Sequence, residues 1–185
     1  MPPNCQFEID DAEDEWTYSH KFDYIHGRGL ATCFKSHLSV FQSAFRFARP
    51  GGYFELQDGL FPVRCIDDTL KGTALEKWCN LVTAGANALG QNWSQVPRYA
   101  AYMKEAGFVD VIEKKFAWPL GPWAQGERMK ILGTLCRENL LVSVHGMSMA
   151  VMTKGLGMTS EEVELLLPDV KKDINNIKIH CYAAM

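Results

Sequence analysis

The sequence predicts an α/β layer fold with a largely parallel sheet. Short apolar segments with period-two spacing alternate along the chain with amphipathic segments of helical spacing. Glycine and proline clusters separate the two kinds of segment. The composition, with 47% hydrophobic and 22% charged residues in 185, is that of an ordinary globular chain. The length fits a single domain that spans residues 1–185.

The strand pattern occurs in four places, which are residues 6–9, 22–26, 53–58 and 108–116. In the first of these, Phe7 and Ile9 fall on one face at period two. The second stops at Gly27 and Gly29. Open sheets usually have about five or more strands, so four strands predict an incomplete sheet.

Helical spacing begins with Leu38, Phe41 and Phe45, which predicts a helix that ends before Pro50. Further helices are expected at 69–89, 97–107, from about 122 to 145, 160–167 and 169–177. Thr159 and Glu162 form a capping box at the start of the fifth helix. Residues 177–182 are expected to open a last strand that the chain does not complete.

The net charge and the cysteine pattern indicate which partners and which cellular compartment to expect. The net charge of −3 argues against a nucleic-acid partner. The amino end has no basic and apolar leader, and no apolar run is long enough to span a membrane. The six scattered cysteines form no CxxC pair. We therefore expect an intracellular protein with reduced thiols, in the cytoplasm or the nucleus, without a membrane partner.

Polar residues follow two of the expected strands. Asp10 and Asp11 come after the first strand, and His26 and Arg28 close the second. Ligands of parallel α/β sheets bind beyond the carboxyl ends of the strands, where a carboxylate can accept from an amine or a ribose hydroxyl. Gly27 and Gly29 have no side chain beyond Cα, so the backbone of this loop could approach a ligand closely. The alternative is that the acidic residues form a solvated loop that caps a helix.

Other residue patterns in the sequence give weaker indications of a functional site. The five histidines show no HxxxH or HExxH spacing, so we expect no metal site. His145 beside Gly146 predicts a helix end rather than a base. The tryptophans and methionines are expected in the core, with an acceptor pocket as the alternative; they are Trp78, Trp93, Trp118, Trp123, Met147, Met149 and Met152.

Five segments, in this order and at about this spacing, resemble fungal class I S-adenosylmethionine-dependent methyltransferases. This is the group that includes the regulator of fungal secondary metabolism. The segments are PPNCQFEIDDAEDEWTY, KFDYIHGRGL, RPGGYFELQD, AGFVDVIEKKFAWPLGPW and GMTSEEVELLLPDVKKDI. The resemblance implies S-adenosylmethionine as cofactor and a small molecule as methyl acceptor.

The resemblance also implies roles for individual residues. Asp11 would bind the adenine amino group, and Ala12 would contact the ring through its backbone. His26, Gly27 and Arg28 would lie beside the methionine portion of the cofactor. His26 is also the one histidine near enough to serve as a general base.

The chain departs from the family pattern in two regions. Its 185 residues contain no acidic residue followed by G-x-G after a first strand, and no second strand with a ribose-binding carboxylate. The fold implied is therefore an incomplete Rossmann-like class I methyltransferase fold, the carboxyl-terminal two-thirds of the domain. It would lack the first two strand–helix units and the last strand.

Three functions remain open from the sequence. The first is methyl transfer to an O, N or C acceptor in small-molecule metabolism. The second is a non-catalytic remnant or partner subunit that binds a protein, or a second copy, through an exposed sheet edge. The third is a cofactor-free cyclase that uses the acceptor pocket. Three or four missing cofactor interactions predict a dissociation constant of about a millimolar or worse for this chain.

Overall fold

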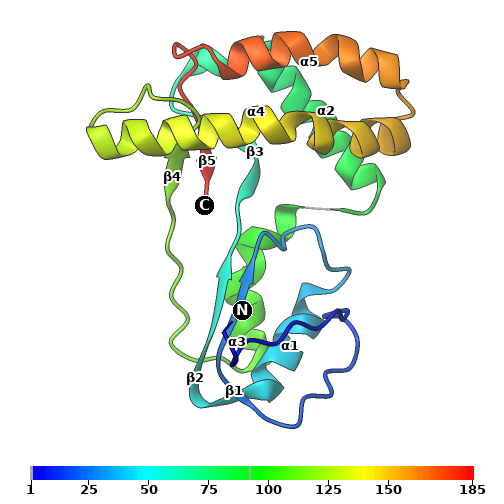
Figure 1. The fold of residues 1–185 in the computed structure, drawn as a ribbon, viewed down its shortest axis with the longest axis vertical. Helices are drawn as coiled ribbons and strands as arrows, with labels where there is room; N and C mark the ends of the chain where they lie inside the picture. Colours follow the sequence, from blue (N-terminus) through cyan, green and yellow to red (C-terminus); the bar gives the residue numbers. More distant parts are fainter. Residues whose placement is uncertain (1, 92) are drawn as a thin grey trace.

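The structure is a computed structural model that describes residues 2–91 and 93–185. Its elements fall into two parts, and the chain passes between them after β2, before α3 and after α3 (Figure 1). One part contains β1 (Phe22–Arg28), α1 (His37–Phe47), β2 (Ala48–Gln57) and α3 (Tyr99–Ala106). The other contains β3 (Leu60–Cys65), α2 (Ala74–Ala88), β4 (Ala117–Pro119), α4 (Glu127–Leu156), α5 (Ser160–Ile174) and β5 (Cys181–Ala184). Short 3₁₀ turns occupy Asp68–Leu70 and Trp93–Arg98.

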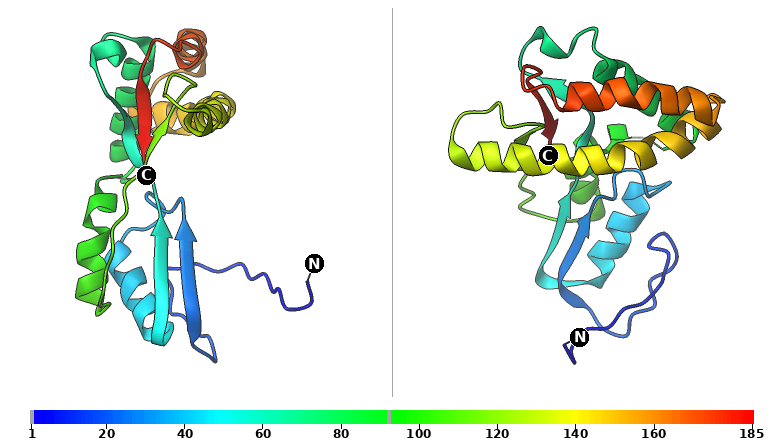
Figure 2. Two further views of the ribbon diagram at one scale, coloured as in Figure 1. Left: turned by 90° about the vertical axis from the view of Figure 1, so that its left-hand side faces the viewer. Right: turned by 45° about the horizontal axis from the view of Figure 1, so that its top comes forward.

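The first part is a parallel strand pair covered on one face. β1 pairs with β2 in parallel, and α1 makes the crossover between them. α1 begins at Ser36, whose hydroxyl accepts from the Ser39 amide, and it buries Phe41 completely. α1 and α3 lie on the same side of the two strands (Figure 2). A parallel pair with a helical crossover is the unit from which doubly wound sheets are built.

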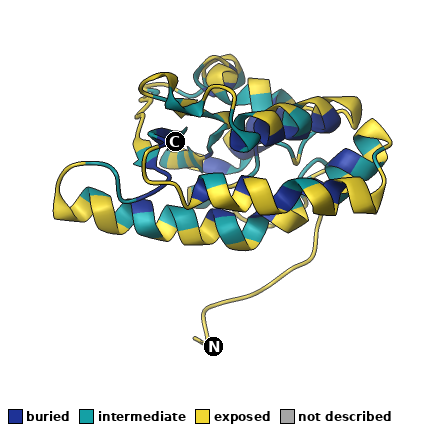
Figure 3. Ribbon diagram, turned by 90° about the horizontal axis from the view of Figure 1, so that it is seen from above, coloured by how far each residue is buried: buried dark blue, intermediate teal, exposed yellow. Residues whose placement is uncertain are grey.

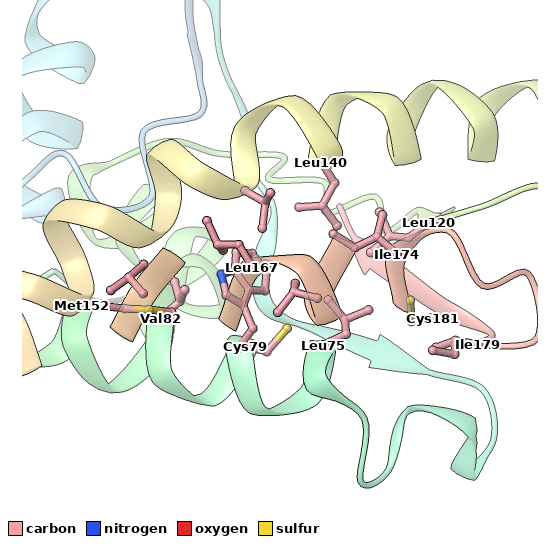
Figure 4. Packing of buried hydrophobic residues seen from close by; sticks show 14 residues of the cluster. Leu75, Cys79, Val82, Leu120, Leu140, Met152, Leu167, Ile174, Ile179 and Cys181 are labelled. Carbon is pink, nitrogen blue, oxygen red and sulfur yellow. The ribbon is translucent and has the colours of Figure 1, made fainter. Parts of the chain in front are cut away.

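The second part is an antiparallel sheet packed with three helices. Its strand order is β3-β5-β4, so β5 pairs on both sides. The prediction of a largely parallel sheet is therefore wrong for these three strands and holds only for β1 and β2. Buried side chains from α2, α4 and α5 form the main core beside this sheet (Figure 4). The Trp78 indole donates to Ser148 Oγ at 2.7 Å, which ties α2 to α4 inside that core. The exposed and buried positions alternate along α4, as expected for a helix that covers one side of the molecule (Figure 3).

The structure corrects the strand predictions. The strands at 22–26 and 53–58 are confirmed, but residues 6–9 and 108–116 are not strands. Ile9 and Val109 are almost fully exposed, and neither lies in a paired strand. Within 108–116 only Phe116 pairs, through two backbone hydrogen bonds with Met185 just after β5. Conversely, β3 and β4 form at residues that the periodicity did not indicate. A period-two pattern shows which residues could form a strand, whereas pairing decides which residues do.

The helix predictions also need correction near the carboxyl end. α4 continues through His145 and Gly146 to Leu156, so the prediction of a helix end at His145 is wrong. α5 continues through Pro168, which is exposed and has no N–H to donate within the helix, so the helix predicted to stop at 167 is one helix to Ile174. The predicted capping box of Thr159 is confirmed. Residues 181–184 complete a strand, where the sequence led us to expect only its beginning.

Nowhere in residues 2–91 and 93–185 does a helix combine the length and the apolar character that crossing a bilayer requires.

Candidate functional site

Asp58 is the central polar residue at the carboxyl ends of the parallel strands. It follows β2 directly and is buried, with 9% of its surface exposed. Its Oδ1 accepts from the backbone amides of Leu30 at 2.6 Å and Ala31 at 3.2 Å. These two bonds hold the loop that leaves β1 against the end of β2. Asp58 therefore fixes the shape of the edge at which parallel sheets bind ligands.

Tyr99 completes the hydrogen bonding of Asp58 from α3. Its hydroxyl donates to Asp58 Oδ2 at 3.0 Å. Burial, and then the negative charge of Asp58, raise the pKa of Tyr99 well above its ordinary value. The hydroxyl therefore stays protonated and remains a donor to the carboxylate.

His37 lies beside this pair at the amino end of α1. It is only 4% exposed, and its ring is 5.4 Å from that of Tyr99 and 5.3 Å from that of Phe34. Burial lowers the pKa of His37, although the carbonyl of Ala31 and the charge of Asp58 act in the opposite direction. His37 Nε2 has no hydrogen-bond partner among the residues described. The imidazole is thus a buried, neutral group with one polar atom unused.

The open face of the β1–β2 pair carries a row of exposed polar and aromatic side chains. These are Tyr24, His26 and Arg28 from β1 and Tyr53, Glu55 and Gln57 from β2. The Tyr24 hydroxyl donates to Glu55 Oε2 at 2.5 Å, which raises the pKa of Tyr24 and lowers that of Glu55. His26 lies opposite Glu55 in the strand register, and its ring stacks on Tyr24 with centroids 6.0 Å apart.

The two glycines at the end of β1 differ in their surroundings. A Cβ on Gly27 would lie 2.7 Å from both Leu30 Cδ1 and Leu56 Cδ2. Gly27 is therefore needed for packing on the covered face. Gly29 has φ of +70°, and a Cβ there would meet nothing within 4 Å. The backbone at Gly29 is therefore exposed on its Cβ side, and its conformation favours glycine.

Asp11 and Ala12 lie in a turn that is held against the amino end of α1. Asp11 Oδ1 accepts from the Glu13 amide at 2.9 Å, and Glu13 Oε1 accepts from the Ser36 amide at 2.9 Å. Ala12 packs against the apolar cluster around Phe41, and its carbonyl accepts from the Trp16 indole at 3.0 Å. The acidic turn thus reaches the same helix end that follows the β1 loop. Asp11 itself is exposed, which fits both the ligand and the solvated-loop interpretation.

A cavity of about 330 Å³ opens along β3, shortly after Asp58 in the chain. Phe61 and Trp93 line it, with ring centroids 5.0 Å apart, together with Arg64 and Asn87. Trp78 is instead fully buried in the main core, and the Trp123 indole donates to the Cys181 carbonyl. Met152 is fully buried in that core, with Met147 and Met149 packed against it. Among the tryptophans, then, Trp93 lines a cavity and Trp78 fills the core.

Sequence reasoning missed three residues of this site. Asp58 follows the carboxyl end of a correctly predicted strand, so the rule that selected His26 and Arg28 would also have selected it. Tyr99 and His37 gave no such signal, because each lies inside a helix pattern and reaches Asp58 only through folding. Among the residues that the structure describes, no three His, Cys, Asp or Glu side chains converge in a metal-binding arrangement.

Parallel strands with a helical crossover place the chain among α/β proteins, whose ligands bind beyond the carboxyl ends of the strands. No family model matches the chain. It is 29% identical over 180 residues to "Methyltransferase pytC" of Aspergillus terreus. That alignment covers 97% of this chain and 56% of the relative. It is 32% identical over 184 residues to "Methyltransferase cpsF" of Aspergillus campestris, covering 97% of this chain and 65% of the relative.

A third relative is the "Secondary metabolism regulator laeA" of Monascus pilosus, 28% identical over 98% of this chain and 50% of its own length. The chain is therefore homologous to a fungal methyltransferase-like group, which confirms the resemblance drawn from its residues. The chain spans between about half and two thirds of the length of these relatives.

Proposed function

We propose that the chain is an S-adenosylmethionine-dependent methyltransferase-like protein of small-molecule metabolism, with an O, N or C atom as acceptor. The observation that carries the proposal is similarity over 97% of the chain to relatives named methyltransferases. The two parallel strands with polar residues at their carboxyl ends support it.

The residues at this edge fit the cofactor in part. When bound, S-adenosylmethionine supplies a methyl group that is open to attack by a nucleophile. The exposed Asp11 carboxylate can accept from the adenine amino group, with the Ala12 backbone beside the ring. Gly29 leaves room for close approach, and Arg28 beside it is exposed. Asp58 is a positioning residue, because its bonds to Leu30 and Ala31 set the shape of this loop.

The chemistry assigned to the protein's own residues is mostly positioning. Methyl transfer needs the acceptor atom in line with the methyl group, and holding two reactants in such a geometry lowers a barrier by as much as about 7–11 kcal/mol. His26 is exposed at the end of β1 and can accept a proton from an O–H or N–H acceptor. The neutral, buried His37 has no access to solvent through which such a proton could leave.

The test is equilibrium binding of S-adenosylmethionine to the 185-residue chain, followed by amide chemical shifts at millimolar ligand. We expect saturable binding with a dissociation constant of about a millimolar, because the chain supplies only some of the contacts. The shifts should concentrate at residues 11–13 and 28–31. Asp11→Ala should weaken the binding about tenfold, because it removes one polar contact.

Asp14→Ala is the matched control. Asp14 is exposed in the same acidic turn, so this variant removes the same charge without removing the proposed contact. The control should bind like the wild type. Equal loss in both variants, or no shifts at the two loops at millimolar ligand, would contradict the proposed site.

A second candidate function rests on the strand edge. In the part of the chain described, β1 pairs with β2 alone, so its other edge presents unpaired N–H and C=O groups. A partner subunit that acts through this edge would associate without cofactor. This candidate would be favoured over methyl transfer if the wild-type chain bound no S-adenosylmethionine at millimolar concentration and still associated stably with a partner chain.

A further inference from the structure

Cys65 and Cys181 lie directly opposite each other in the antiparallel ladder of β3 and β5. The register pairs Cys65 with Cys181 and Arg64 with Tyr182. Directly opposite residues of an antiparallel pair project on the same face. Here that face is the inner one, because Phe61 and Val63 of β3 pack against the core that contains Cys181.

The hydrogen bonding shows which kind of pair this is. The Ile66 amide donates to the His180 carbonyl at 3.3 Å, so the neighbouring pair is the hydrogen-bonded one. The Cys181 carbonyl instead accepts from the Leu120 amide at 3.0 Å, on the β4 side. Cys65 and Cys181 are therefore a non-hydrogen-bonded pair, in which Cα atoms lie about 4.5 Å apart. That separation lies within the range of about 4.4–6.8 Å that a disulfide can bridge.

The two thiols differ in access. Cys65 is half-buried at the end of β3, with its sulfur 3.2 Å from Asp67 Oδ1. Cys181 is only 2% exposed, and burial raises the pKa of its thiol to about 12 (Figure 4). A reagent from solution therefore reaches Cys65 first, and Cys181 reacts only with a group already held beside it.

We propose that Cys65 and Cys181 form a reversible disulfide in response to a low-molecular-weight disulfide of the glutathione type. The Cys65 thiol gives up its proton, and its sulfur attacks oxidised glutathione. One glutathione leaves and takes up that proton. The Cys181 sulfur then attacks the sulfur of Cys65, and the second glutathione leaves with the proton of Cys181. Two cysteine thiols are thus oxidised, and one oxidised glutathione is reduced to two thiols.

The disulfide would join β3 to β5, the central strand of this sheet. This link complements the hydrogen bonds of a short β5 that is only four residues long. All six cysteines are free in the structure. Transient disulfides in otherwise reduced proteins are usually catalytic or redox-sensing.

The experiment is oxidation of the folded 185-residue chain with oxidised glutathione, followed by alkylation of remaining thiols and digestion with trypsin. Trypsin places Cys65 in CIDDTLK and Cys181 in IHCYAAM. We expect these two peptides joined as one species, two hydrogens lighter than their sum, and released by dithiothreitol. A stable glutathione adduct on Cys65 with Cys181 free to be alkylated would overturn the proposal.

Three variants separate the steps. Cys181→Ser should leave glutathione attached to Cys65, and Cys65→Ser should leave Cys181 unmodified. Cys79→Ser tests the competing buried thiol, since Cys79 lies close enough to Cys181 for the Cys181 thiol to raise the pKa of Cys79 further. The joined peptide should still form in that variant. A link between Cys181 and Cys79 in the wild type would contradict the assignment.

Discussion

At the scale of single residues, Asp58 is the side chain on which the candidate site depends most. Asp58→Ala removes the acceptor for two loop amides and for the Tyr99 hydroxyl. Hydrogen bonds to a charged group are worth about 1.5–3 kcal/mol. After the substitution, the two amides and the hydroxyl can form hydrogen bonds only with water. We expect the free energy of unfolding in urea to fall by about 3 kcal/mol.

Tyr99→Phe is the comparison for Asp58→Ala. It removes one of the three donors and leaves the loop after β1 in place, so it should lower the stability by about 1 kcal/mol. Amide shifts at Leu30 and Ala31 should change in Asp58→Ala and stay near wild type in Tyr99→Phe. Similar changes in both variants would mean that Asp58 does not fix the loop.

His37 gives the protein a pH dependence on the acid side. Burial lowers the pKa of His37 in the folded state below its ordinary value of 6.5, so the unfolded chain binds the proton more readily. Its contribution to stability is full above pH 6.5. It is lost progressively as the pH falls from there through the lower pKa of the folded state.

The measurement is the free energy of unfolding between pH 8 and pH 5. The slope of stability against pH below about 6.5 should be smaller in His37→Gln than in the wild type. His20→Gln, at an exposed histidine in the same part of the chain, is the control. An unchanged slope in His37→Gln would show that other groups cause the acid sensitivity.

At the scale of elements, the crossing of α2 and α4 depends on glycine. A Cβ on Gly85 would lie 2.4 Å from the Val151 carbonyl oxygen, and one on Gly155 would lie 2.4 Å from the Gly85 carbonyl oxygen. Backbone atoms cannot move aside as a flexible side chain can. Gly85→Ala should therefore force the helices apart and cost about 1–3 kcal/mol of stability, measured by thermal or urea unfolding.

Gly146 in α4 provides the opposite case. A Cβ there would meet nothing within 4 Å, so Gly146→Ala only removes backbone freedom from the unfolded chain and should stabilise by about 0.5–1 kcal/mol. Opposite signs for these two glycine-to-alanine changes would verify the crossing. Equal signs would show that the helices do not approach at Gly85.

The same scale shows what local patterns can determine. Apolar spacing and the capping box identified α1, α2 and α5, because a helix satisfies its own backbone hydrogen bonds. Strand β5 needs β3 and β4 as partners. β4 lies more than 60 residues before β5 in the sequence, and β3 lies further still. The alternation at 108–116 could not reveal that pairing with the β5 end begins only at Phe116.

At the scale of the whole molecule, the β1 edge predicts self-association. The unpaired edge and the exposed Tyr24 beside it offer backbone groups and apolar surface to a second copy. We expect a concentration-dependent dimer in sedimentation velocity. Tyr24→Lys places a charge on the edge strand and should lower the dimer fraction severalfold, because a lysine must be desolvated for the edge to pair.

Leu165→Lys is the control for the added charge. Leu165 is exposed on α5, in the other part of the molecule, so this variant changes the net charge equally and leaves β1 intact. It should dimerise like the wild type. A wild type that stays monomeric at high concentration would contradict association through this edge.

The sequence by itself determined the α/β class, the two parallel strands with their crossover helix, and the methyltransferase-like relationship. It could do so because spacing and segment order are local properties of the chain. Only the tertiary structure decided that Asp58, Tyr99 and His37 meet, that Gly27 serves packing, and that Cys65 faces Cys181. These are contacts between residues far apart in sequence, and their geometry depends on strand register and helix packing, which no local pattern encodes.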